Sequence, residues 1–212
     1  GVMDYFSKNS WSVGGFNCLL INQVPGGSGL SSSAAFQVLI GTIVNGLFNG
    51  GNIAPLEIAK AGQYAENVHF GKPSGLMDQT ASAVGGVSSI DFKVPDSPKV
   101  EQILFDFIEH GYALCVIDTG VYHHDLNDAY ASIPNEMFEV ASFMGKSKLR
   151  ELSQAEFYKV LPSMVGTISD RALLRAMHFF EDSQRAVDQA GALKDGDIRA
   201  FLALINQSGR SS

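Results

Sequence analysis

The fold of this chain is decided by residues 24–35, Val-Pro-Gly-Gly-Ser-Gly-Leu-Ser-Ser-Ser-Ala-Ala. A glycine-rich loop stands here directly before a predicted helix whose first turn carries three serines. Glycine allows positive φ and lets a ligand approach the backbone closely. The free N–H groups and positive dipole end of the helix favour a phosphate, while serine hydroxyls can cap the helix, bond phosphate oxygens or ligate Mg²⁺. The stretch therefore predicts a phosphate site, although a tight turn before a buried, capped helix would give the same pattern.

This loop is not a Walker A motif, because no Gly-Lys-Ser/Thr follows the glycines. A nucleotide bound here would rely on backbone amides and a metal rather than on a lysine. The order Pro-x-x-x-Gly-Leu-Ser-Ser-Ser-Ala-Ala resembles the second signature motif of the GHMP kinases, and its Gly-Leu-Ser-Ser-Ser form is most similar to galactokinases. The ATP-binding residues that the resemblance implies are Pro25, Gly26, Gly27, Ser28, Gly29, Leu30, Ser31, Ser32, Ser33 and Ala34.

The composition excludes several other classes of function. The 212 residues are 45% hydrophobic, which is enough for a core in one large domain or two small ones. A net charge of −7 argues against a nucleic-acid or anionic-membrane surface. The longest apolar stretch, residues 34–48, is too short and too polar to cross a bilayer. We therefore expect a soluble cytoplasmic protein, in which Cys18 and Cys115 lie in apolar runs as buried, reduced thiols.

The hydrophobic pattern predicts an α/β chain that becomes mainly helical after a proline-rich turn at residues 95–98. This turn places the predicted boundary between two lobes, residues 1–100 and 101–212. Ser153 and Glu156 are expected to form a capping box. The predicted strands cover residues 16–24, 87–92, 102–107 and 112–118. The predicted helices cover residues 31–48, 55–68, 76–84, 125–144 with a break at Pro134, 153–161, 170–193 and 197–206.

A second glycine loop, residues 71–75, leads into the helix that carries Asp78 in its first turn. The helix dipole stabilises a carboxylate there, which suits an acceptor for a hydroxyl proton during phosphoryl transfer. An acidic residue that simply favours a helix N-terminus is the alternative. The run Ser-Gly-Leu-Met-Asp-Gln resembles the galactokinase sequence Cys-Gly-Ile-Met-Asp-Gln. The resemblance implies that Asp78 is the catalytic base and that Gly75 contacts the sugar.

Glu66 lies twelve residues before Asp78, close to an apolar helical stripe. From the pattern alone, a solvated helix charge is the expected role. The resemblance to galactokinases instead implies that Glu66 ligates Mg²⁺ together with Ser33. An oxygen-only shell with few protein ligands is what Mg²⁺ on ATP requires.

Residues 116–126 contain His123 and His124 and invite a zinc hypothesis. Adjacent histidines on a loop point apart, and no third His or Cys lies nearby at zinc-like spacing. The segment instead resembles a galactokinase region with the pattern Ile-Asp-Thr-Asn-Val-x-His-Ser-Leu…Tyr, whose tyrosine touches the sugar, which implies a substrate contact by Tyr130. Gly120 replaces the usual Asn, and residues 133–135 replace a frequent Arg-Arg pair, so the choice of sugar stays open.

The resemblance covers nearly the whole chain and implies a two-lobed GHMP-kinase fold. Its N-terminal lobe would be similar to the second domain of ribosomal protein S5, and its C-terminal lobe would be mainly helical with antiparallel strands. The family's first motif, Pro-Gly-Arg…Gly-Glu-His-Thr-Asp-Tyr, and its third, Gly-Gly-Gly-x-Gly-Gly, are absent. We therefore expect an internal fragment of a longer kinase, with both lobes partial, inactive by itself and prone to self-association.

The function implied by the resemblance is transfer of the γ-phosphate of ATP, with Mg²⁺, to the anomeric hydroxyl of galactose or a related sugar in carbohydrate metabolism. A GHMP kinase for another small alcohol is one alternative. A non-catalytic galactokinase-like sensor of ATP and sugar, signalling to a partner, is the other.

Overall fold

The computed structural model describes residues 1–24, 29–72, 74–117 and 127–212. They divide into two compact units, Gly1–Ser88 and Ser89–Ser212. The expected division into functional lobes near residue 100 stays a prediction. Within the described part of the chain, no helix is long and apolar enough to cross a membrane.

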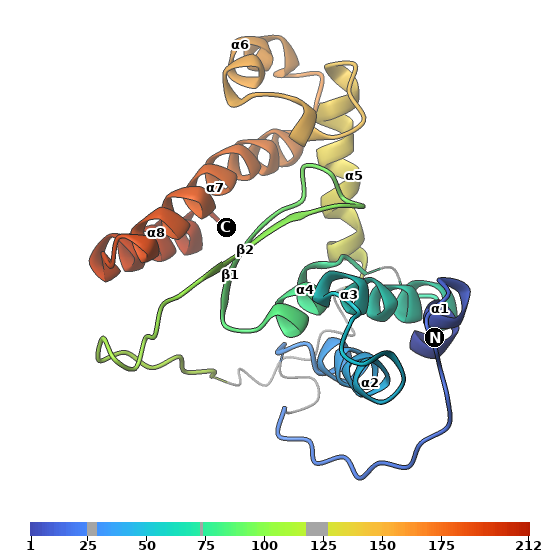
Figure 1. Cartoon of the computed structure of the whole chain (residues 1–212). Coiled ribbons are helices and arrows are strands. Elements are labelled where there is room, and N and C mark those ends of the chain that lie inside the picture. The colour runs from blue at the N-terminus through green and yellow to red at the C-terminus, as the bar shows by residue number, and fades with distance from the viewer. Residues whose placement is uncertain (25–28, 73, 118–126) are drawn as a thin grey trace. The chain divides into compact units, whose positions relative to one another are not determined.

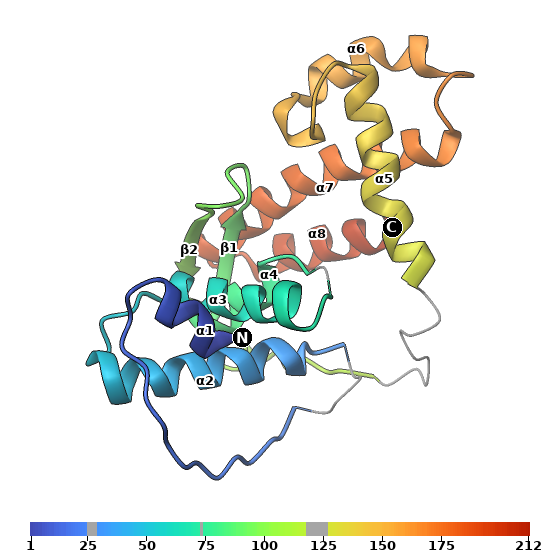
Figure 2. The same ribbon diagram turned by 90° about the vertical axis from the view of Figure 1, so that its right-hand side faces the viewer.

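The first unit is a helical assembly built around one long apolar helix. Helix α2 (Ser32–Asn49) packs against α3 (Pro55–Tyr64) and α4 (Met77–Val84), while α1 (Val2–Lys8) packs against α2 and α3 (Figures 1 and 2). These contacts bury a single apolar cluster, which makes the unit rigid enough to position side chains at the helix ends. The buried members of this cluster are Val2, Phe6, Val38, Val44, Ile53, Ile58, Ala61 and Ala65.

Local sequence signals explain where these helices begin and end. Helix α2 ends at Gly50, which takes the left-handed conformation with φ 59°, and α3 starts with Pro55 at a position where its missing N–H costs nothing. The side chain of Asn45 bonds both backbone groups of Ile53, at 2.9 and 3.1 Å, and so ties the turn to α2. A π-helical segment, η1 (Ala65–His69), continues α3. The expected helices over 31–48, 55–68 and 76–84 are thus confirmed, the second with a π-helical end.

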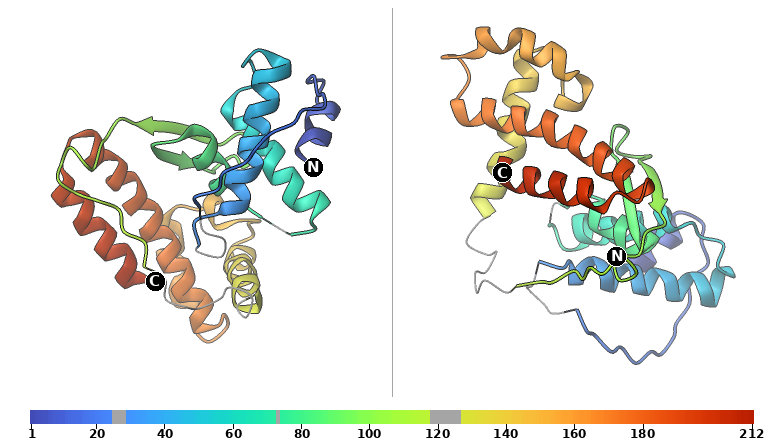
Figure 3. Two further views of the ribbon diagram at one scale, coloured as in Figure 1. Left: turned by 90° about the horizontal axis from the view of Figure 1, so that it is seen from below. Right: turned by 90° about the vertical axis from the view of Figure 1, so that its left-hand side faces the viewer.

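A two-stranded sheet follows, formed by β1 (Val87–Asp91) and β2 (Lys99–Ile103) around the proline-rich turn. The second unit is otherwise helical. Helix α8 (Ile198–Ser211) folds back along α7 (Asp170–Lys194), and α7 also packs against α5 (Asn127–Phe143) and α6 (Gln154–Met164) (Figure 3). A short 3₁₀ segment, η3 (Leu149–Glu151), precedes α6. The buried core of this unit is formed by Val140, Ala141, Leu149, Leu152, Phe157, Met164, Ile168, Ala172, Leu173, Ala176 and Phe180.

Two sequence signals in the second unit, the capping box at Ser153 and the proline at 134, have different outcomes. The predicted capping box is present: the Ser153 hydroxyl accepts from the Glu156 N–H, and the Glu156 carboxylate accepts from the Ser153 N–H at 2.7 Å. The expected break at Pro134 is wrong, because α5 continues through this residue. Contact between α5 and α7 compensates for the backbone bond that proline cannot make.

Two predicted strands are wrong. Residues 16–24 and 112–117 have no regular secondary structure, and most of their apolar side chains are exposed, with Leu19 at 90% and Leu114 at 91%. A strand requires a hydrogen-bonded neighbour, and alternating apolar residues alone do not supply one. Cys18 and Cys115 lie in these segments and are exposed, which overturns the expectation of buried thiols.

The strand predicted over residues 102–107 starts earlier and ends at Ile103. The Asp106 carboxylate accepts from the Ile108 N–H at 2.8 Å, and this bond favours a turn. The rings of Phe105 and His110 then stack with centroids 4.3 Å apart, and Phe107 packs against Phe201 of α8. Local polar and aromatic contacts therefore replace the end of the predicted strand.

Candidate functional site

The N-terminus of α2 meets the N-terminus of α4 through one hydrogen bond. Ser31, the N-cap residue of α2, donates from its hydroxyl to Oδ2 of Asp78 in the first turn of α4. Its φ of 54° lies in the left-handed region, which is unusual for a residue with a Cβ. Ser31 makes no capping bond to its own helix. The hydroxyl that would ordinarily cap α2 therefore orients Asp78 instead.

The first turn of α2 presents backbone donors toward the preceding glycine loop. The first intrahelical bond joins the Ala35 N–H to the Ser31 carbonyl at 3.1 Å, so the N–H groups of residues 32–34 precede the helical ladder. Gly29 has a φ of 76°, a conformation that glycine adopts without strain and other residues rarely take. This end of α2 has the chemistry of an anion site: aligned N–H groups, a positive dipole end and a glycine beside them.

Glu66 on η1 is buried, with only 4% of its surface exposed, so the solvated helix charge expected from the pattern alone is wrong. Burial acts to raise the pKa of this carboxyl group. Together, the hydrogen-bonding effects of the Ser33 and Ser74 side chains, the Lys72 charge and the Gln37 side chain outweigh the effect of burial. The Lys72 Nζ lies 3.8 Å from Oε1 of Glu66. The net result is a pKa below the ordinary value, and hence an ionised carboxylate beside Ser33.

The loop before α4 is held by amide side chains from the preceding helices. The Ser74 N–H donates to Oδ1 of Asn67 at 2.8 Å, and Gln63 donates to the Ser74 carbonyl at 3.2 Å. Gly75 follows and is exposed. A shallow, open depression is lined by Asn67, Gly71, Ser74 and Gly75. The backbone is therefore held at Ser74, and the next residue, Gly75, is exposed three positions before Asp78.

These contacts bring four of the predicted site residues together in the first unit: Ser31, Ser33, Glu66 and Asp78. Gly29, Leu30, Ser32 and Ala34 lie in the same loop and helix start, and Gly75 lies just before α4. The remaining predicted ATP-binding positions, 25–28, lie outside the described residues. Tyr130 lies on α5 in the second unit, and its contact with a substrate stays a prediction. The histidines at 123 and 124 also lie outside the described residues.

Two site residues were missed by the sequence reasoning. Gln37 and Gln79 are 5% and 2% exposed, and both face the Glu66 carboxylate. The signal was present, because Gln37 is a polar residue on the buried face of a mainly apolar helix. A buried polar side chain is more informative than another buried apolar one.

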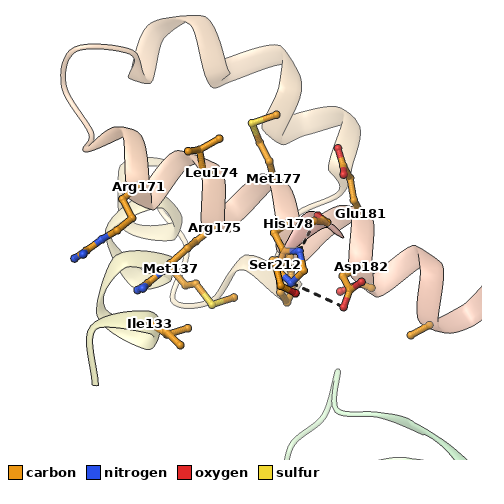
Figure 4. Close-up of a pocket in the computed structure, with 14 residues that line it drawn as sticks. Ile133, Met137, Arg171, Leu174, Arg175, Met177, His178, Glu181, Asp182 and Ser212 are labelled. Carbon is orange, nitrogen blue, oxygen red and sulfur yellow. Dashed lines mark hydrogen bonds and ion pairs between the residues drawn. The ribbon is translucent and has the colours of Figure 1, made fainter. Parts of the chain in front are cut away.

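The second unit has its own pocket, of about 990 Å³, between α5, α7 and the end of α8 (Figure 4). Its walls are mostly apolar, with Ile133 and Met137 from α5. The two arginines at its rim are not free: Arg171 and Arg175 both pair with the buried Glu136, the latter at 2.8 Å. Arg171 and Arg175 are therefore engaged in an ion-pair network with Glu136.

Comparisons with known proteins show which family this chain resembles. Residues 1–86 match the model of the GHMP kinases N terminal domain. The chain is 33% identical over 203 residues to a galactokinase of Lacticaseibacillus casei, covering 93% of this chain and 50% of the relative. It is 30% identical over 213 residues to a galactokinase of Clostridium beijerinckii, covering 98% of this chain and 53% of that relative. The chain thus spans about half the length of the curated relatives it matches.

A solved structure shows the same fold. The crystal structure of Lactococcus lactis galactokinase complexed with galactose matches all of this chain and 54% of that protein, with a TM-score of 0.68 at 20% sequence identity. The helices with a small two-stranded sheet are therefore part of the α/β fold seen in that enzyme. The expected fold class is confirmed. On these findings, residues 1–86 match the N-terminal domain of the GHMP kinases, and the chain is similar to galactokinases over almost its whole length.

Proposed function

We propose that this chain carries the phosphate loop, the metal ligands and the catalytic base of an ATP-dependent sugar kinase of the cytoplasm. The reaction is transfer of the γ-phosphate of ATP to the anomeric hydroxyl of galactose or a related sugar. One observation carries the proposal: the start of α2 is joined through Ser31 to Asp78 and through Ser33 to Glu66. In this proposal, a phosphate site, two hard oxygen ligands and a carboxylate base lie close to the start of α2.

Phosphoryl transfer depends mainly on positioning and on charge stabilisation. The N–H groups of residues 32–34 and the loop that ends at Gly29 would hold the phosphate oxygens of ATP. Residues 25–28 belong to the same predicted ATP-binding motif. This arrangement replaces the lysine of a Walker A loop with backbone donors and a cation.

Asp78 is positioned to accept the proton of the attacking hydroxyl. Ser31 occupies its Oδ2, which leaves Oδ1 for the sugar. A carboxylate in the first turn of a helix is stabilised in its charged form by the dipole, as a base requires. Gly75, which is exposed and lies three residues before Asp78, and Tyr130 would position the sugar.

Ser33 and Glu66 fit Mg²⁺ as its protein ligands. The hydroxyl and carboxylate are hydrogen-bonded to each other, both offer oxygen, and the carboxylate is ionised. Mg²⁺ bound there would neutralise charge on the phosphates of ATP. Two ligands suffice, because Mg²⁺ on a nucleotide keeps water and phosphate oxygens in its shell.

ATP binding tests the first half of this proposal directly. Calorimetric titration of the chain with ATP should give a measurable Kd that tightens when Mg²⁺ replaces EDTA. Gly29→Val, which forces a β-branched residue into positive φ beside the proposed phosphate site, should weaken ATP binding both with Mg²⁺ and with EDTA. Unchanged affinity in this variant would remove the loop from the nucleotide site.

Turnover tests the second half and separates the enzyme from its two alternatives. Because the relatives are about twice as long, we propose that these 212 residues alone have almost no kinase activity. Transfer from ATP should be assayed with a sugar panel on this chain and on a longer protein that contains it. Turnover of a sugar supports the kinase, turnover of another small alcohol identifies a different GHMP acceptor, and binding without turnover identifies a sensor.

A further inference from the structure

Three buried polar side chains meet inside the first unit, and they come from three different elements. Gln37 lies on α2, Glu66 on η1 and Gln79 on α4, with exposed fractions of 5%, 4% and 2%. Polar side chains of this kind are rarely buried unless hydrogen bonds or charge partners offset the cost of desolvation. The Ser33 side chain also acts on Glu66 and lowers its pKa.

The charge on Glu66 dictates how the two amides are oriented. A carboxylate offers only acceptors, so each glutamine must turn its NH₂ group toward it. The Nε2 of Gln79 lies 3.5 Å from Oε2 of Glu66, and the Gln37 side chain contributes to the lowered pKa of Glu66. The carbonyl oxygens Oε1 of Gln37 and Gln79 are left buried, and neither finds a partner among the described residues. Both amides thus satisfy Glu66 at the expense of their own carbonyl groups.

The backbone of α3 makes room for this cluster at Gly62. A Cβ at this position would lie 3.1 Å from Cγ of Gln79 and 3.2 Å from both Cβ and Oε1 of Gln37. These distances are tighter than ordinary van der Waals contact, so the two glutamines pass over α3 where it has no side chain. The close approach restricts the positions that the amides can take.

We infer that Gln37 and Gln79 are positioning residues that fix the carboxylate of Glu66 for Mg²⁺. Gln79 lies 3.5 Å from this carboxylate, and Gln37 and Ser33 both act on Glu66 to lower its pKa. Partners behind a metal ligand orient it and raise its affinity, and their removal typically weakens metal binding by about 10- to 100-fold. This inference rests on the proposed function, because it requires Mg²⁺ at Ser33 and Glu66.

The test compares ATP affinity with Mg²⁺ and with EDTA. Gln37→Met and Gln79→Met keep the side-chain volume and remove the donors. Each should reduce the Mg²⁺-dependent gain in ATP affinity by at least about tenfold. ATP affinity in EDTA should stay within about twofold, because the backbone donors of the loop are untouched.

Asn45→Ala supplies the matched control for loss of a buried amide. Asn45 is 8% exposed and lies on the same helix as Gln37, but it bonds the backbone of Ile53 away from the site. This variant should lower the melting temperature and leave the Mg²⁺-dependent gain unchanged. If both glutamine variants behave like the control, the glutamines are structural and the inference is wrong.

The outcomes also separate this inference from the proposed function. If Mg²⁺ does not tighten ATP binding to the unaltered chain, the metal site itself is wrong. If Mg²⁺ does so and both glutamine variants retain the full gain, only the positioning role is wrong. Because the two substitutions lie on different helices, either variant that folds is sufficient for the test.

Discussion

Gly62→Ala is the substitution that most directly links packing to the candidate site. In an exposed helix interior, alanine is more favourable than glycine by about 1 kcal/mol. At Gly62 the new methyl group would stand 3.1–3.2 Å from Gln37 and Gln79, so those side chains must shift by a few tenths of an ångström. Overpacking of this kind costs about 1–3 kcal/mol. The sum predicts a variant that is about 0–2 kcal/mol less stable than the original.

Gly46→Ala is the control on α2, where a Cβ would meet nothing within 4 Å. Gly46→Ala should gain only the higher helix propensity of alanine, without the cost of overpacking. The two variants should therefore differ by about 1–3 kcal/mol in free energy of unfolding. Urea denaturation measures this difference, and ATP titration with and without Mg²⁺ measures the effect on the site. Gly62→Ala should lose part of the Mg²⁺-dependent gain, whereas Gly46→Ala should not. Equal stabilisation by both substitutions would refute the packing argument.

Further substitutions test individual groups. Asp78→Asn should lower the kcat of a longer, active protein by at least about 100-fold with little change in melting temperature, and an equal loss of stability would indicate a structural role. Gly29→Leu should weaken ATP binding as Gly29→Val does, because both place a Cβ at positive φ. The pKa of Glu66 is lowered in the folded chain, so its charge stabilises the fold fully above about pH 4.5, and this stabilisation is lost as the pH falls through the folded-state pKa. Urea unfolding curves of Glu66→Gln should lack this contribution to the loss of stability at low pH. Ser153→Ala should cost about 1 kcal/mol by removing the capping box, as measured by urea denaturation.

The helices could be predicted from sequence because their signals are local. Pro55 at a helix start, Gly50 after a helix end and the Ser153 capping box each act within one turn of chain. Sheet structure depends on partners that are distant in sequence. The segment over residues 16–24 alternates as a strand does, yet it has no regular structure here. A pattern of period two states which residues would share a face, and it does not state what would pair with the strand.

The site could be predicted only in part. The glycine loop and the serines pointed to a phosphate site through the chemistry of a helix N-terminus, and the roles of Asp78 and Glu66 followed from a family resemblance. The burial of Glu66 could not be predicted, because its helix changes to π geometry at Ala65 and no local rule signals that change. The bond from Ser31 to Asp78 joins residues 47 positions apart, so it became visible only in the folded chain.

Several departures from local rules in the first unit involve Ser31, Glu66 and the two buried glutamines. Ser31 takes a left-handed conformation and does not cap its helix, Glu66 is buried on a π-helical turn, and two amides leave their carbonyls unpaired behind it. Each feature costs stability when considered alone. Natural sequences break such rules mainly where function requires it, so these departures support the proposal that the end of α2 is the functional centre.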